Sequence, residues 1–176
     1  MTTIYTIGHS TRGAAEFNDL LLTYGIELLV DVRQFPGSRR YPHFGSAALA
    51  ASLADVGIDY RHEVDLGGRR RGQPDSPNGY WRNDSFRAYA DYLATAPFHS
   101  ALERLIDWAM RQRLAIMCSE AVPWRCHRFL ISDVLVSRGI EVVHILDVRN
   151  SQPHVLNPNA RMDAAGHLTY PLPLER

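Results

Sequence analysis

Lysine is absent from the 176-residue chain, so all 19 of its basic residues are arginines. This absence excludes a Schiff-base lysine, a lysine general base and the phosphate-binding lysine of a Walker motif. A genome-wide preference for arginine codons is the simplest cause of the bias. Acidic residues also number 19, so the formal net charge is zero and no global field draws the chain toward nucleic acid or acidic membranes.

Cysteine is scarce as well, because Cys118 and Cys126 are the only two. Two cysteines are too few for a secreted disulfide scaffold, and the first residues lack the pattern of a signal peptide. No apolar run approaches the ~20 residues that a membrane-spanning helix needs. We therefore expect a cytoplasmic protein with free thiols and no membrane partner.

The composition is that of an ordinary globular protein, with 45% hydrophobic and 22% charged residues. The length suits one domain, and a domain of this size buries roughly 70% of the surface of its unfolded chain. We expect a single domain over residues 1–176, with a core that needs no disulfide or metal for its stability.

Segments typical of strands and helices alternate along the chain. Apolar or β-branched runs predict strands at residues 2–7, 28–32, 58–62, 114–117 and 141–145. Helical spacing of apolar residues predicts helices around residues 17–24, 46–56, 84–93, 97–109 and 126–137. Four or five strand–helix units are too few for an eight-fold barrel. The pattern therefore predicts an α/β fold, a three-layer sandwich with a mostly parallel open sheet flanked by helices.

Two segments lack a clear element. Residues 63–83 hold four glycines, two prolines and the run Arg69-Arg70-Arg71, and a connection of that length is usually a lid or a disordered segment. The tail over residues 150–176 contains four prolines. We expect it to pack on the surface, with residues 168–172 as a candidate edge strand.

Polar residues follow three of the predicted strands. In open parallel sheets, ligands bind beyond the carboxyl ends of the strands, so we expect these residues to converge on one site. They are His9 and Ser10 after the first strand, Asp31 and Arg33 at the end of the second, and Cys118 and Glu120 after the fourth.

Two cysteine segments are candidates for catalysis. At the end of its strand, Cys118 with Glu120 can supply a nucleophile and a general base. At the start of a helix, Cys126 with His127 and Arg128 can supply a thiolate, because helix amides and a neighbouring arginine lower the pKa of a thiol. His9 is a further acid–base candidate. The alternative for each segment is capping and core packing.

An anion site is the second expectation. Arg33 with Arg39 and Arg128 can form a guanidinium cluster for a phosphate, sulfate or carboxylate. Ser38 and the amides near Ser10 add hydrogen-bond donors. The alternative is a structural ion pair between Asp31 and Arg33, since residues two apart on a strand share a face.

The sequence requires no cofactor and assigns no metal site. The spacing between Cys118 and Cys126 is not that of a zinc knuckle, and the adjacent Cys126 and His127 rarely chelate one ion. Metal binding completed by His9 or Glu120 stays open as an alternative. A transient redox role for the two cysteines also stays open, although a permanent disulfide does not suit the cytosol.

Taken together, these motifs resemble the domain of unknown function 488 family of microbial proteins. The resemblance rests on Ile7-Gly8-His9-Ser10, Val30-Asp31-Val32-Arg33 with Pro36 and Ser38-Arg39, Leu66-Gly67-Gly68, Cys118-Ser119-Glu120, Cys126-His127-Arg128, His154, Pro158 and Leu168-Thr169-Tyr170-Pro171. It implies a single cytosolic α/β domain with no established activity. Relatives often carry Cys-Ala-Glu where this chain has Ser119, which leaves the cysteine and carboxylate in place.

The leading functional interpretation is a cysteine-dependent hydrolase or transferase that acts on a phosphate-bearing or other anionic small molecule or nucleotide. One alternative is a nucleic-acid or nucleotide-binding module without catalysis, which would use the arginines at 69–71 with Tyr80 and Trp81. A second alternative is a metal-binding or redox-sensing protein that uses Cys118 and Cys126.

Overall fold

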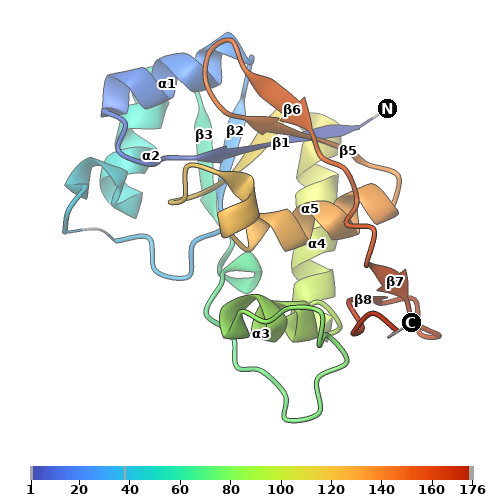
Figure 1. Ribbon diagram of the computed structural model, residues 1–176. Helices are drawn as coiled ribbons and strands as arrows, with labels where there is room; N and C mark the ends of the chain where they lie inside the picture. Colours follow the sequence, from blue (N-terminus) through green and yellow to red (C-terminus); the bar gives the residue numbers. More distant parts are fainter. Residues whose placement is uncertain (1, 38, 175–176) are drawn as a thin grey trace.

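The computed structural model describes residues 2–37 and 39–174. Six strands form one sheet in the order β3-β2-β4-β1-β5-β6 (Figure 1), and all neighbours are parallel except β5 and β6. The strands are β1 (Thr3–Gly8), β2 (Leu28–Asp31), β3 (Asp59–His62), β4 (Leu114–Cys118), β5 (Glu141–Ile145) and β6 (Ser151–Pro153). The predicted α/β fold with a mostly parallel sheet is confirmed.

The central strands are the ones with unbroken apolar runs. Every residue of β2 and β4 is buried, as expected for parallel strands covered on both faces. The edge strand β3 is polar and largely exposed, so it lacks the unbroken apolar run of the central strands.

Helices cover both faces of the sheet and complete the three layers. The helices α1 (Ala14–Thr23) and α2 (Ser46–Asp55) pack on one face with Leu29 and Met117. The opposite face, with Val30 and Ile116, is covered by α3 (Asp84–Tyr92), α4 (Ala96–Arg111) and α5 (Arg128–Ser137). The two apolar clusters alternate along each strand because successive side chains point to opposite faces.

The first turns of α3 and α2 are capped by Asn83 and Gly45. Asn83, rather than Asp84 or Ser85, caps α3, because its side-chain oxygen accepts hydrogen bonds from the backbone N–H groups of Ser85 and Phe86. Ser46 is the first residue of α2 and does not cap it, since Gly45 occupies that position without a side-chain hydrogen bond.

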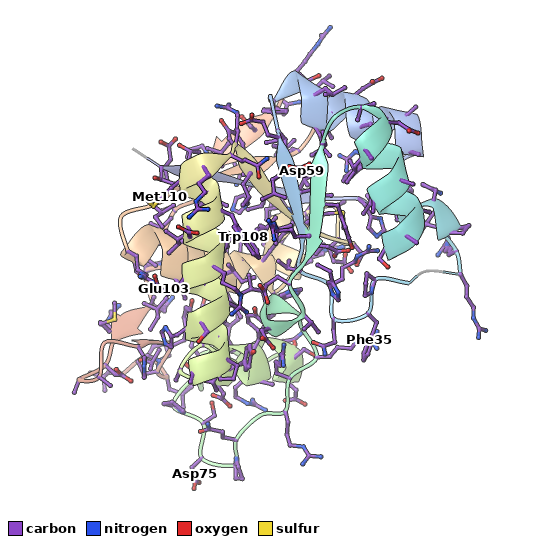
Figure 2. The ribbon with its side chains drawn as sticks, turned by 180° about the vertical axis from the view of Figure 1, so that it is seen from behind. Phe35, Asp59, Asp75, Glu103, Trp108 and Met110 are labelled. Carbon is purple, nitrogen blue, oxygen red and sulfur yellow. The ribbon has the colours of Figure 1, made fainter. Side chains whose placement is uncertain are left out.

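The connection over residues 63–83 is fastened to α3. The carboxylate of Asp91 accepts hydrogen bonds from the backbone N–H of Gln73, at 2.9 Å, and from the side-chain amide of Asn78, at 2.7 Å. Asp75 marks the outer tip of the segment (Figure 2). The segment thus has a fixed inner end and an exposed tip.

The tail contributes more structure than its sequence predicts. The missed strand β6 pairs antiparallel with β5, whereas β7 (Arg161–Met162) and β8 (Leu168–Thr169) form a separate two-stranded sheet. The expectation that residues 168–172 add an edge strand to the main sheet is therefore wrong. Within the described ranges, no helix is long and apolar enough to cross a membrane.

The topology creates a crevice between β1 and β4. These neighbouring strands pair in parallel, but the chain leaves β1 through α1 on one face and leaves β4 through α5 on the other (Figure 1). The carboxyl ends of two strands whose connections diverge in this way form the usual ligand site of an open α/β sheet.

Candidate functional site

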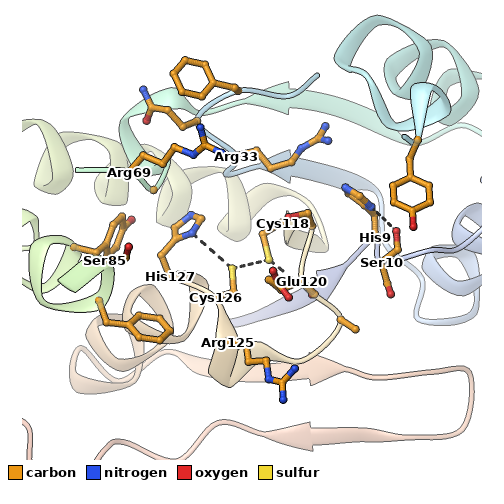
Figure 3. A pocket seen from close by; sticks show the side chains of 18 of the residues that line it. His9, Ser10, Arg33, Arg69, Ser85, Cys118, Glu120, Arg125, Cys126 and His127 are labelled. Atoms are coloured by element: carbon orange, nitrogen blue, oxygen red, sulfur yellow. Dashed lines mark hydrogen bonds between the residues drawn. The ribbon is translucent and has the colours of Figure 1, made fainter. Parts of the chain in front are cut away.

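A cavity of about 920 Å³ lies at this crevice (Figure 3). Its walls come from the carboxyl ends of the strands, the loop after β2, the segment before α3 and the start of α5. Seven of the residues selected from the sequence line it together. They are His9, Ser10, Arg33, Cys118, Glu120, Cys126 and His127.

The loop after β4 folds directly over the end of β1. A Cβ atom on Gly8 would lie 1.6 Å from the carbonyl oxygen of Glu120, so only glycine permits this approach. The backbone N–H of Ser10 donates to the carbonyl of Ser119 at 3.0 Å, and Ser10 has a left-handed φ of 51°. Strained backbone of this kind is concentrated at functional sites.

The two cysteines meet in the cavity wall. Cys118 ends β4, and Cys126 follows a 3-10 turn (Pro123–Arg125) just before α5, yet their Sγ atoms are 2.6 Å apart. Both are free thiols, with 2% of Cys118 and 5% of Cys126 exposed. Figure 3 shows the pair beside the ring of His127.

His127 is oriented to accept a proton from Cys126. Its Nε2 lies 2.8 Å from the carbonyl oxygen of Val32, which can only accept, so Nε2 carries the hydrogen. The neutral ring therefore presents the lone pair of Nδ1 to the Sγ of Cys126 at 3.6 Å. Burial lowers the pKa of His127, which favours this neutral form.

The thiols differ in acidity. Burial raises the pKa of Cys118 well above its ordinary value, and the neighbouring Cys126 raises it further. Burial also acts to raise the pKa of Cys126, but the hydrogen bond from Cys118 and the charge of Arg128 outweigh it and lower that pKa. The backbone N–H of Arg128 also donates to Cys126 Sγ at 3.5 Å. Cys126 is thus the more acidic thiol of the pair.

Arg128 lies beneath the site and does not line the cavity. It is completely buried, and its guanidinium donates to the hydroxyl of Thr6 and to the carbonyl of Glu120, both at 2.9 Å. Its role is to hold the loop after β4 and to place a positive charge below Cys126. The structure therefore places Arg128 away from the anion position for which it was selected.

A buried hydrogen-bond chain continues from Arg128 across the domain. The Thr6 hydroxyl contacts His144 Nδ1, His144 Nε2 contacts His154 Nδ1 at 2.8 Å, and His154 Nε2 contacts the carboxylate of Asp133 at 2.6 Å. With both rings neutral, a donor can face an acceptor at every contact of this hydrogen-bond chain, in one direction from Arg128 to Asp133. Burial lowers the pKa of His144 to about 3, which keeps it neutral.

One ring nitrogen of His9 has no hydrogen-bond partner among the residues that the structure describes. It is buried against Phe44, with ring centroids 4.3 Å apart, and its Nδ1 donates to the carbonyl oxygen of Ser10 at 2.9 Å. Nε2 therefore carries the lone pair of the neutral ring. Burial lowers the pKa of His9, so the ring stays neutral at neutral pH and this nitrogen keeps its lone pair as a proton acceptor.

Asp31 and Arg33 form the structural ion pair that was the alternative to an anion site. Arg33 Nε and Nη2 donate to the two carboxylate oxygens of Asp31 at 2.9 and 2.7 Å, and Tyr60 donates to the same carboxylate. Arg33 still lines the cavity, whereas Asp31 is buried below it.

Other arginines supply the exposed positive charge of the cavity. Arg40, Arg69 and Arg125 line it, whereas Arg39 is exposed outside the lining. The guanidinium of Arg69 lies over the ring of Phe35, which projects from the loop after β2 (Figure 2). Ser38 lies outside the described residues.

Sequence reasoning missed Arg125 as a cavity residue, although a basic residue directly before Cys126 was a usable signal. It also missed Asp133 and His144. These two residues are linked through His154 of the tail, and their spacing in the sequence does not indicate that link. Glu120 lines the cavity with an exposed side chain, and its carbonyl, rather than its carboxylate, makes the hydrogen bonds found here.

A family comparison agrees with the resemblance of the motifs. The family model described as Domain of unknown function DUF488 matches residues 13–135. The chain belongs to the DUF488 family. Searches of the curated proteins and of the solved structures gave no significant match.

The DUF488 match covers one part of the site and leaves out another. It includes Cys118, Cys126 and His127, but ends inside α5, before His144 and His154. His9 and Ser10 lie just before it begins. Within the ranges 2–37 and 39–174 of this DUF488 protein, no three His, Cys, Asp or Glu side chains are grouped to hold a metal ion.

Proposed function

We propose that this chain is a cysteine-dependent enzyme, a hydrolase or transferase, that acts on an anionic small molecule in the cytoplasm. One observation carries the proposal: the Sγ of Cys126 lies between the Nδ1 of His127 and the thiol of Cys118, in the wall of a cavity bordered by arginines. A nucleophile next to an oriented base is the usual signature of covalent catalysis.

The first chemical step is deprotonation of Cys126. Its thiol proton passes to His127 Nδ1, while the hydrogen bond to the Val32 carbonyl holds the imidazole in place. The charge of Arg128 and its backbone N–H stabilise the resulting thiolate. The thiolate then attacks an electrophilic carbon or phosphorus of the substrate. His127, now protonated, gives its proton to the leaving group.

The charge of the cavity selects the substrate class. Arg40, Arg69 and Arg125 line it, and none of the ion pairs among the described residues involves these three. Their guanidinium groups are free to pair with a phosphate or carboxylate. The volume of about 920 Å³ suits a molecule of nucleotide or short-peptide size.

A second acid–base group faces the same cavity. His9 lies across from the cysteines, on the loop after β1, with Nε2 available as an acceptor. In a transferase or hydrolase this nitrogen would activate the acceptor hydroxyl or water that releases the covalent intermediate from Cys126. Glu120 is a further candidate for this role.

Thiol alkylation against pH tests the proposal. We expect Cys126, in wild type and in Cys118→Ser, to react with iodoacetamide with an apparent pKa below the ~8.5 of a free cysteine. The ratio of the alkylation rate with anionic iodoacetate to that with neutral iodoacetamide should be higher for Cys126 than for a free thiol. The double variant Arg69→Gln/Arg125→Gln should lower this ratio to that of a free thiol. An inert Cys126 in the folded protein, or one with an ordinary pKa, would overturn the proposal.

A further inference from the structure

We propose that Cys118 resolves covalent intermediates on Cys126, so that the pair reduces small anionic disulfides. This inference rests on the proposed nucleophilic role of Cys126 and adds to it a second thiol and a substrate class. A hydrolase needs only one cysteine in this position, whereas this cavity wall contains two.

The geometry of the pair suits disulfide formation. The Sγ atoms of Cys118 and Cys126 are 2.6 Å apart, and a disulfide bond requires about 2.05 Å. Cys118 is held by the pairing of β4 with Gly8 of β1, and Cys126 by the start of α5. Closing the bond therefore shortens the distance between the two Sγ atoms by about half an ångström.

The surroundings assign a different task to each thiol. The base His127 and the backbone N–H of Arg128 both contact Cys126, which makes it the attacking sulfur. Cys118 is the more buried of the two, and among the described residues its thiol forms hydrogen bonds with Cys126 and, at 3.9 Å, with the carbonyl of Glu120. It can reach the Sγ of Cys126 far more easily than it can reach a substrate in the cavity.

The reaction balances in two exchanges. The Cys126 thiolate attacks one sulfur of a disulfide R–S–S–R, the S–S bond breaks, and the first R–S⁻ leaves with the proton held by His127. Cys118 loses its proton and attacks the Sγ of Cys126, which forms the Cys118–Cys126 disulfide and releases the second R–S⁻ to take up that proton. The substrate gains two electrons and the cysteine pair loses two. A dithiol reductant returns the pair to the reduced state.

The size and charge of the cavity favour an organic disulfide over a peroxide. A hydroperoxide needs neither a volume of about 920 Å³ nor three guanidinium groups that form no ion pair with any described carboxylate. A disulfide of a small carboxylated peptide uses both features, because its carboxylates can pair with Arg40, Arg69 and Arg125 while its sulfur atoms reach Cys126.

Oxidised glutathione is the test probe, and cystamine, a small cationic disulfide without carboxylates, is the charge control. Reduced protein is mixed with each disulfide, quenched with an alkylating agent and analysed by intact-mass and peptide mass spectrometry. In wild type we expect a Cys118–Cys126 disulfide, two released glutathione molecules and no lasting adduct. We expect oxidised glutathione to react at least about tenfold faster than cystamine, and the difference to shrink at high salt.

The single variants separate the two tasks. Cys118→Ser should stop at a stable glutathione adduct on Cys126, and Cys126→Ser should give neither adduct nor disulfide. The inference is overturned if wild type keeps the adduct as Cys118→Ser does, or if cystamine reacts as fast as oxidised glutathione. A low-pKa Cys126 that alkylates but never forms the disulfide would sink this inference and leave the proposed function standing. A Cys126 that does not alkylate would end both.

Discussion

The imidazole Nε2 of His127 donates to the backbone carbonyl of Val32 at 2.8 Å and thereby links the start of α5 to the end of β2. This bond fixes both the tautomer and the direction of the ring, because the remaining nitrogen can then only accept from Cys126. A backbone carbonyl cannot be altered by substitution of its own side chain, so the orientation of this imidazole depends on the fold.

Replacing the base is the first prediction. His127→Asn should raise the apparent pKa of Cys126 and reduce its alkylation rate at pH 7 by about tenfold, since one pKa unit changes the thiolate fraction by that factor. His62→Asn is the matched control, because His62 also donates its Nε2 hydrogen to a backbone carbonyl, that of Arg33, but lies on the edge strand β3 outside the cavity. Equal rates in the two variants would show that His127 is not the base.

Gly8 provides the second prediction. In Gly8→Ala the new methyl group would meet the Glu120 carbonyl at 1.6 Å, so the loop after β4 must move away from β1. We expect a loss of about 3 kcal/mol or more of unfolding free energy, together with slower alkylation of Cys126. Gly13→Ala is the control, because a Cβ there meets nothing within 4 Å. Urea denaturation measures both, and similar midpoints for the two variants would contradict the prediction.

The third prediction concerns Asp133, the carboxylate at the end of the buried hydrogen-bond chain that starts at Arg128. The Asp133 carboxylate accepts hydrogen bonds at 2.6 Å from both His154 and the Tyr170 hydroxyl. Asp133→Asn removes the charge and turns one acceptor into a donor, which should cost about 3 kcal/mol. Asp75→Asn at the exposed tip of the segment over residues 63–83 should stay within about 0.5 kcal/mol of wild type. Thermal and urea unfolding compare them, and a stable Asp133→Asn would show that the chain does not need its carboxylate.

Stability should fall in acid because of His144. Its pKa is about 3 in the folded protein against an ordinary value of 6.5, so its contribution is complete above pH 6.5 and is lost as the pH falls toward 3. In that window the unfolded state binds the extra proton, which gives a slope of about 1.4 kcal/mol per pH unit from this group. His9 and His127, whose pKa values are also lowered by burial, act in the same direction.

The variant His144→Asn isolates the contribution of this histidine. Urea unfolding of wild type and variant from pH 7 down to pH 4 should show a shallower decline in the variant, whatever its stability at pH 7. If the unfolding free energies of wild type and variant fall with the same slope against pH, His144 is not the source of the acid sensitivity.

The sequence predicted the frame of the site because strand ends are local features. Apolar runs located β1, β2 and β4, and the rule that ligands bind beyond parallel strands brought His9, Cys118 and Arg33 to one edge. These local sequence patterns could not show whether Arg33 binds an anion or forms an ion pair with Asp31. The ion pair with Asp31 depends on where both side chains are buried, which only the packed structure determines.

Long-range features had no sequence signal. Ser151–Pro153 lacks the pattern of a strand, and β6 exists because the edge of β5 offers backbone hydrogen bonds. The contact between His144 and His154 likewise depends on how the tail returns along the sheet. The distance between Cys118 and Cys126 depends on the 3-10 turn between them. A single proline, Pro123, does not by itself predict that turn.

The position of β1 between β4 and β5 sets the order in which the site can form during synthesis. Gly8 and His9 leave the ribosome early, but their hydrogen-bonding partner Cys118 is added about a hundred residues later. At roughly 5–20 residues per second this interval lasts about 5–20 s, during which Ile4 and Ile7 of the nascent chain have no strand to pair with. Ribosome-bound chains that end before β4 therefore expose an apolar strand that a holding chaperone can bind, and those that extend beyond β5 do not.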